Sequence, residues 1–200
     1  MKSLQFNSEE SWLEARKGKI TGTRLKDIIS KRGGDKKIGY YEILAERVAI
    51  PANGENVMDR GHRLEDDALV RFATETGKKV KNKLTMWVRE DDLDIAISPD
   101  GEISPTEAVE CKCLSSARHI EALLTNRIPS EYEYQVLQYF IVNDKLKKLY
   151  FVFYDPRMPK DFFYIEVNRK DKMVEIKDYL EIERQTLKEL ALDEEKLTFK

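Results

Sequence analysis

The segment KLYFVFYD, residues 148–155, constrains the fold more than any other part of the sequence. It joins aromatic and branched apolar residues without the polar alternation of a strand that has one face in water. Both of its faces must therefore be covered, which places it inside a sheet with helices packed on either side. A second strand, FFYIEV at 162–167, follows across the proline-containing turn DPRMPK.

Helical and strand patterns alternate along the rest of the chain. Strands are expected within 79–90, 93–98 and 107–113, where the turn signals DD and SPDG separate them. Helices are expected over 8–18 with Ser8 as N-cap, from about 21–23, over 38–50, 56–77, 115–126 and 129–144 with a Ser130–Glu133 capping box, and from about Asp171. The fold class is thus α/β (mixed α+β), a central mixed β-sheet flanked by helices. Its 200 residues fit one domain, 1–200.

Composition excludes several classes of protein. Hydrophobic residues make up 41% and charged residues 36%, and no apolar run approaches the roughly 20 residues of a membrane span. The N-terminus lacks the pattern of a secretory signal, so we expect a cytoplasmic protein without disulfides. A net charge of -2 gives no overall positive field, although a local basic patch could still hold phosphates.

The segment AVECKC at 108–113 raises the question of a metal or redox site. Two Cys and two His without paired spacing cannot form an ordinary structural zinc site, and C-x-C on a strand is not the C-x-x-C of redox proteins. Alternation along a strand puts Val109, Cys111 and Cys113 on one face, as small buried residues, and Glu110 and Lys112 on the other. That pair is either a surface ion pair on an edge strand or part of a functional site.

Two further carboxylates favour the functional site. Asp100 follows the apolar strand LDIAIS, and a hairpin would bring it beside Glu110. Carboxylates so close repel one another unless a cation offsets them, and a hard, oxygen-preferring ion such as magnesium is the economical choice. Glu65 falls on the apolar stripe of its helix, where a carboxylate needs a partner or a metal, unless it lies at the exposed edge of that stripe.

Together these residues resemble the PD-(D/E)xK nuclease superfamily, which has a restriction-endonuclease-like core. Within it the chain resembles the lambda-exonuclease-like, or YqaJ-type viral recombinase, family. The matching blocks, in order, are WLEARKGKITGT at 12–23, GHRLE at 61–65, SPD at 98–100 with ECK at 110–112, and YEYQVLQY at 132–139. The family often has Ser where this chain has Thr23, and beyond about residue 145 only the strand and helix pattern matches.

The resemblance implies a role for each residue at the site. Asp100 and Glu110 would bind magnesium, or manganese in its place, with the backbone carbonyl of Cys111, and Glu65 would serve a second ion. Lys112 would hold the attacking water and favour its deprotonation. Gln135 would orient the water or Lys112, unless it is an interior amide satisfied by backbone.

The first of these blocks, residues 12–23, also implies a phosphate-binding site. Arg16 can grip a phosphate, a helix beginning near Gly22 would present free N–H groups, and Thr23 adds a hydroxyl. The resemblance assigns this site to a terminal 5′-phosphate, with Ser98 adding a contact. Without the resemblance, Arg16 reads as a solvated helix residue.

The implied activity is 5′–3′ degradation of one strand of linear double-stranded DNA to mononucleotides. The product would carry a 3′ overhang for a single-strand annealing protein in phage-type recombination. The resemblance also implies a homotrimer around DNA, in the host cytoplasm if a phage encodes it. The alternatives are an endonuclease or junction resolvase on the same fold, and a non-catalytic binding protein.

Overall fold

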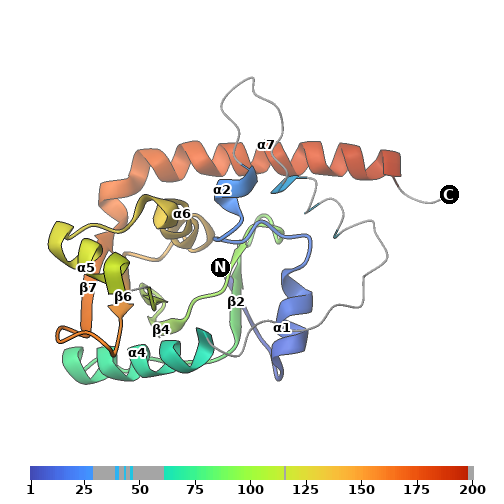
Figure 1. Cartoon of the computed structure of the whole chain (residues 1–200). Helices are drawn as coiled ribbons and strands as arrows, with labels where there is room; N and C mark the ends of the chain where they lie inside the picture. Colours follow the sequence, from blue (N-terminus) through green and yellow to red (C-terminus); the bar gives the residue numbers. More distant parts are fainter. Residues whose placement is uncertain (29–38, 41–42, 44–45, 47–60, 115, 198–200) are drawn as a thin grey trace.

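Two small sheets form the centre of the structure, a computed structural model that describes residues 1–28, 39–40, 43, 46, 61–114 and 116–197 (Figure 1). One sheet is antiparallel in the order β1 (Lys2–Gln5), β2 (Thr85–Val88), β3 (Ala96–Ile97). The other has the order β4 (Gly101–Ser104), β5 (Glu107–Lys112), β6 (Lys148–Tyr154), β7 (Phe162–Asn168). β5 and β6 run parallel, whereas the other neighbours are antiparallel. The expected mixed α+β class is confirmed, with the strands divided between two sheets.

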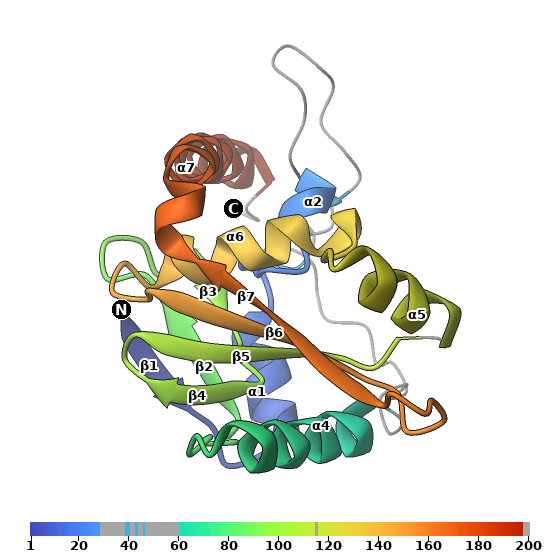
Figure 2. The same cartoon turned by 90° about the vertical axis from the view of Figure 1, so that its left-hand side faces the viewer.

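β6 lies inside its sheet, as its apolar sequence predicts. Its five central residues are buried between β5 and β7. On one face, α4 (Gly61–Thr76) packs Ala68, Leu69 and Phe72 against β5 and β6. On the other face lie α6 (Glu133–Val142) and α7 (Met173–Leu197), so that the sheet is sandwiched between helices (Figure 2).

The remaining helices are short. They are α1 (Glu9–Arg16), α2 (Leu25–Ile28) and α5 (Ser116–Thr125), with 3-10 turns at Ser130–Tyr132 and Arg169–Lys172. Ser8 caps α1 as predicted, because its side chain accepts a hydrogen bond from the Ser11 N–H at 3.2 Å. No described helix combines the length and hydropathy that crossing a membrane requires.

Two predicted helix starts are wrong. The chain between Thr21 and Leu25 is a turn, in which the N–H groups of Arg24 and Leu25 both bond the Thr21 carbonyl, so α2 begins later than Gly22. The predicted Ser130 cap forms no side-chain bond, because a 3-10 turn closed by Tyr132 N–H to the Pro129 carbonyl precedes α6. Most of the helix expected over 38–50, and residues 56–60 of the next, lie outside the described residues.

β5 separates its two faces as the alternation predicts. Val109 and Cys111 are buried in the cluster beneath α4, and both cysteines are free thiols. Glu110 is only 1% exposed on the opposite side. Since β5 lies between β4 and β6, the reading of Glu110 and Lys112 as a surface pair on an edge strand is wrong.

Candidate active site

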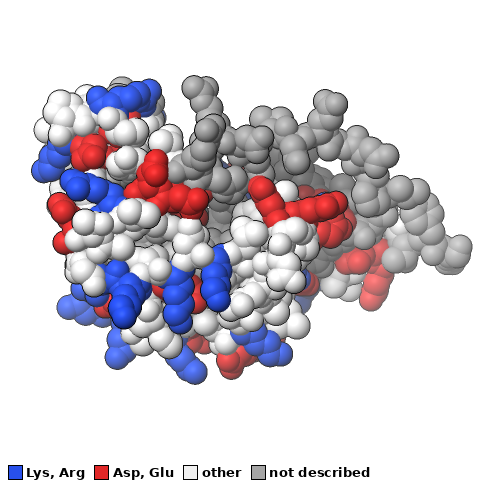
Figure 3. Space-filling model, turned by 90° about the horizontal axis from the view of Figure 1, so that it is seen from below, with Lys and Arg blue, Asp and Glu red and all other residues white. Residues whose placement is uncertain are grey.

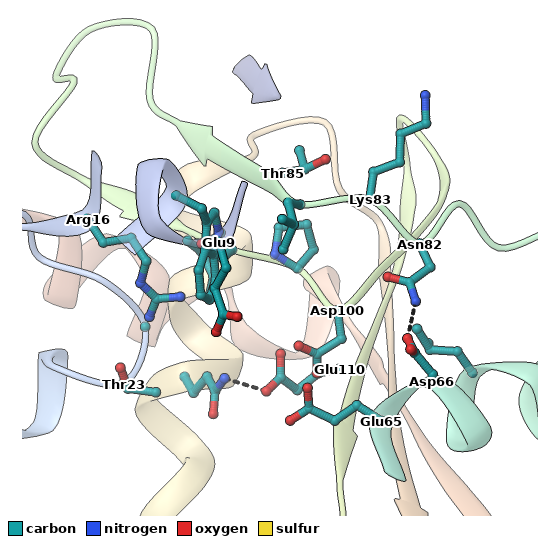
Figure 4. Close-up of a pocket in the computed structure, with 18 of the residues that line it drawn as sticks. Glu9, Arg16, Thr23, Glu65, Asp66, Asn82, Lys83, Thr85, Asp100 and Glu110 are labelled. Carbon is teal, nitrogen blue, oxygen red and sulfur yellow. Dashed lines mark hydrogen bonds between the residues drawn. The ribbon is translucent and has the colours of Figure 1, made fainter. Parts of the chain in front are cut away.

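The β4–β5 hairpin brings the first two carboxylates together. Gly101 pairs with Val109, so Asp100, just before β4, lies across from Glu110. The Asp100 carboxylate accepts a hydrogen bond from the Cys111 N–H at 2.7 Å, which fixes it against β5. Figure 4 shows the carboxylates of Asp100, Glu110 and Glu65 turned toward one another.

Glu110 is the most tightly held of these carboxylates. Its Oε1 accepts hydrogen bonds from Lys112 Nζ, at 2.5 Å, and from Gln135 Nε2, while its Oε2 accepts from the Tyr139 hydroxyl. Four groups from β5 and α6 therefore form one buried network. The alternative reading of Gln135 as an amide satisfied by backbone is wrong, because its partner is a carboxylate.

Glu65 reaches this network from α4. It is half-buried and lines the same cavity as Asp100 and Glu110. Burial raises the pKa of Asp100 well above its usual range, and the charges of Glu110 and Glu65 raise it further while Lys112 lowers it. Three carboxylates facing one another repel when ionised, and a cation bound among them would offset that repulsion.

Lys112 is a permanent cation in this setting. Burial alone would lower its pKa, but the charges of Glu110 and Asp100 outweigh that effect and the pKa is raised. Its Nζ also lies 5.3 Å from the centre of the Tyr132 ring. As an ammonium cation, Lys112 can donate hydrogen bonds and stabilise negative charge.

A cavity of about 520 Å³ extends from the carboxylates to the N-terminal segment. Arg16 of α1 lines it, half-buried, with its guanidinium 4.5 Å from the centre of the Trp12 ring. Burial lowers the pKa of Arg16, and the charges of Glu110 and Asp100 oppose that shift. The Ser98 hydroxyl and the Trp12 indole N–H also lie at this cavity, and both are buried without a hydrogen-bond partner in the described structure.

Thr23 and Gly22 complete this end of the cavity. Thr23 is exposed at the rim, so it is accessible to a ligand, whereas the helix N-terminus expected at Gly22 is absent because that segment is a turn. At Gly22 a Cβ atom would lie 2.6 Å from Ile97 Cδ1 and 3.2 Å from Gln135 Cγ. Only glycine lets this segment approach α6 and β3 so closely.

Two polar contacts were missed from the sequence. Tyr139 follows Gln135 by four residues, the spacing that aligns side chains on one helix face, and this could have indicated a shared partner. Trp12 stands in the N-terminal block four residues before Arg16, again one turn away. For Tyr139 the spacing did not show the partner, Glu110 of β5, whereas for Trp12 the spacing itself indicated Arg16.

The donor set fits a hard divalent cation. Carboxylate oxygens are its preferred ligands, and the buried Asp100 with a raised pKa is a group whose ionised form such an ion would stabilise. Among the described residues, however, no three His, Cys, Asp or Glu side chains already stand at ligand spacing. Both oxygens of Glu110 accept internal hydrogen bonds, so binding an ion would require these side chains to adjust.

The fold is that of a nuclease with an exonuclease-like architecture. Residues 11–145 match the YqaJ-like viral recombinase domain, and the chain belongs to that family. No curated protein matches the chain.

Solved structures agree with this assignment. The alkaline exonuclease LHK-Exo from Laribacter hongkongensis has a TM-score of 0.80 and 28% identity, over 94% of this chain and 95% of that one. Its complex with dAMP matches at 29% identity with the same TM-score and coverage. A phage-related exonuclease from Haemophilus somnus 129PT shares the fold, with a TM-score of 0.56 and 14% identity over 88% of this chain and 96% of that one.

Proposed function

We propose that this protein is a magnesium-dependent 5′–3′ exonuclease that degrades one strand of linear double-stranded DNA to mononucleotides. The observation that carries the proposal is the arrangement of the cavity. Carboxylates suited to a metal line this cavity together with Arg16 and with two buried, unpartnered donors, from Trp12 and Ser98. A terminal phosphate has the oxygen acceptors that such donors require.

Magnesium would be held by Asp100 and Glu110, with the Cys111 carbonyl as a third donor and Glu65 serving a second ion. Bound there, the metal would polarise the scissile phosphate and stabilise the charges on the attacking and leaving oxygens. Manganese, which shares the preference for oxygen ligands, should substitute.

The protein groups position the reactants around this centre. Lys112 would donate a hydrogen bond to the attacking water and stabilise the negative charge that grows on its oxygen as the proton leaves. Gln135 and Tyr139 hold Glu110 in place through its two oxygens. The contact with Glu110 supports a positioning role for Gln135, through the carboxylate it shares with Lys112.

The phosphate end of the cavity favours an exonuclease over an endonuclease or junction resolvase. An enzyme that cuts within a strand must let the chain continue on both sides of the scissile bond. Here Arg16, Ser98 and Trp12 offer hydrogen bonds to a terminal phosphate, with Thr23 at the rim. The dAMP complex of LHK-Exo shows that this related nuclease binds a mononucleotide, as expected of an enzyme that releases one.

The test compares three DNA substrates with magnesium. We expect mononucleotide release from linear duplex with 5′-phosphorylated ends, slower release from 5′-hydroxyl ends, and no cutting of a closed circle. Arg16→Ala should reduce the rate on phosphorylated ends to that on hydroxyl ends, because the guanidinium is the only charged donor that we assign to the phosphate. Efficient cutting of the circle would instead establish an endonuclease.

The family resemblance extends the proposal to assembly and biological role. We propose a homotrimer that encircles the duplex and passes its 3′ overhang to a single-strand annealing protein in recombination. Chemical cross-linking and sedimentation would measure the trimer directly. A monomer that still degrades DNA would refute the ring while leaving the proposed chemistry intact.

A further inference from the structure

The segment KKVKNK, residues 78–83, concentrates four lysines beside the nuclease cavity of a chain whose net charge is -2. It connects α4 to β2 and is tied down along its length. The backbone of Lys81 exchanges two hydrogen bonds with Glu102 of β4, at 2.7 and 3.1 Å. Asn82 donates to Asp66 of α4, and Val80 packs into the cluster beneath that helix.

These anchors decide where the lysines point. Val80 packs beneath α4 and the Asn82 amide bonds Asp66, so the alternation of an extended segment turns Lys79, Lys81 and Lys83 away from these contacts. All three are exposed. Lys78 differs, because it is half-buried and pairs with Glu107 at 2.8 Å.

The neighbouring carboxylates Asp66 and Glu102 bond other groups and not these three lysines. Asp66 accepts its hydrogen bond from the amide of Asn82, and Glu102 accepts one from the Trp87 indole N–H at 2.6 Å. Both carboxylates beside the segment thus accept hydrogen bonds from neutral groups. Across the described residues, no carboxylate forms an ion pair with Lys79, Lys81 or Lys83.

The outward lysines lead away from the active-site cavity. Lys83 lines the cavity together with Glu65 and Asp100, and Figure 4 shows it extending away from Asp100. In an extended segment, alternate residues are about 6.6 Å apart, so three of them span about 13 Å. One strand of B-DNA carries about four phosphates over that length. Figure 3 shows Lys and Arg side chains, with Asp and Glu among them, on the face of the molecule where α4 lies.

We propose that Lys79, Lys81 and Lys83 form a binding track for the DNA backbone, which holds phosphates of the duplex beyond the nucleotide in the cavity. The inference rests on the proposed function only in taking DNA as the ligand. Contacts of this kind are independent of base sequence, as a nuclease that advances along DNA requires.

The test is the salt dependence of binding to a 5′-phosphorylated 20-base-pair duplex, measured by fluorescence anisotropy with chelator present so that no hydrolysis occurs. Each phosphate contact contributes about 0.9 to the slope of log affinity against log salt concentration. The triple variant Lys79→Gln, Lys81→Gln, Lys83→Gln should therefore have a slope shallower by about 2 to 3. The matching Lys→Arg triple should keep the parent slope.

A control triple, Lys145→Gln, Lys177→Gln, Lys188→Gln, removes the same charge from exposed sites outside the cavity lining. An unchanged slope in the first triple, or an equal change in the control, would overturn the track. Nucleotide release by the parent with magnesium tests the proposed function separately. A parent that binds DNA through these lysines but releases no nucleotide would refute the exonuclease and support the track.

Discussion

Glu183 of α7 should make the stability of this protein fall as pH rises, although it lies outside the active-site cavity. Its side chain is fully buried, and its hydrogen bond comes from Gln138 Nε2 at 3.3 Å. Burial, the largest cause, raises the pKa of Glu183 from 4.5 to about 8, although the bond from Gln138 lowers it. Between these values the folded protein keeps a proton that the unfolded chain has released. The free energy of unfolding therefore falls as pH rises.

The expected magnitude follows from the two pKa values. The stabilising contribution of the protonated acid is complete below about pH 4.5 and lost as pH rises through about 8. Between pH 5 and pH 8 this amounts to about 3 kcal/mol. Glu183→Gln removes the titration and keeps a side chain of the same shape, so the variant should gain about that much relative to the parent over this range.

Urea unfolding followed by circular dichroism, at several values between pH 5 and pH 8, measures this difference. Glu181→Gln, at an exposed position of the same helix, controls for the loss of one negative charge from α7. The reasoning is refuted if the free energies of unfolding of the parent and Glu183→Gln change in parallel with pH.

Two predictions concern the active site. Lys112→Ala should lower nucleotide release by about 100-fold or more while DNA binding persists, because the ammonium group stabilises charge that develops only during the reaction. Nucleotide release at the parental rate would remove Lys112 from the mechanism. Gly22→Ala should lower the free energy of unfolding by about 1–3 kcal/mol and slow hydrolysis, since the added methyl group collides with Ile97 beside Gln135. If a thermal melt and a nucleotide-release assay both match the parent, the segment can move aside to accommodate the methyl group.

The carboxylate pair was predictable because its geometry is local. Strand alternation set the face of Glu110, and the Pro105–Thr106 turn between β4 and β5 sets the register that places Asp100 opposite it. The contact of Tyr139 with Glu110 was not predictable, because helix spacing shows which residues share a face but not what that face meets. The start of α2 was misplaced because Thr21 closes a turn with its backbone carbonyl, a choice that the residue types alone do not specify.

One face of α6 fixes the two ends of the cavity relative to each other. Gln135 holds Glu110, and Gln138, one turn later, donates to the carbonyls of Ile20, at 3.2 Å, and Ala96, at 3.3 Å. The Gln135 contact anchors the carboxylate network. The Gln138 contacts anchor the N-terminal segment, which carries the phosphate-binding residues, to α6 and β3. Because both amides are buried on one rigid helix, neither end can shift without breaking a buried hydrogen bond. Under the proposed function, this fixed separation between terminal phosphate and metal is what would select the first phosphodiester bond and release a single nucleotide.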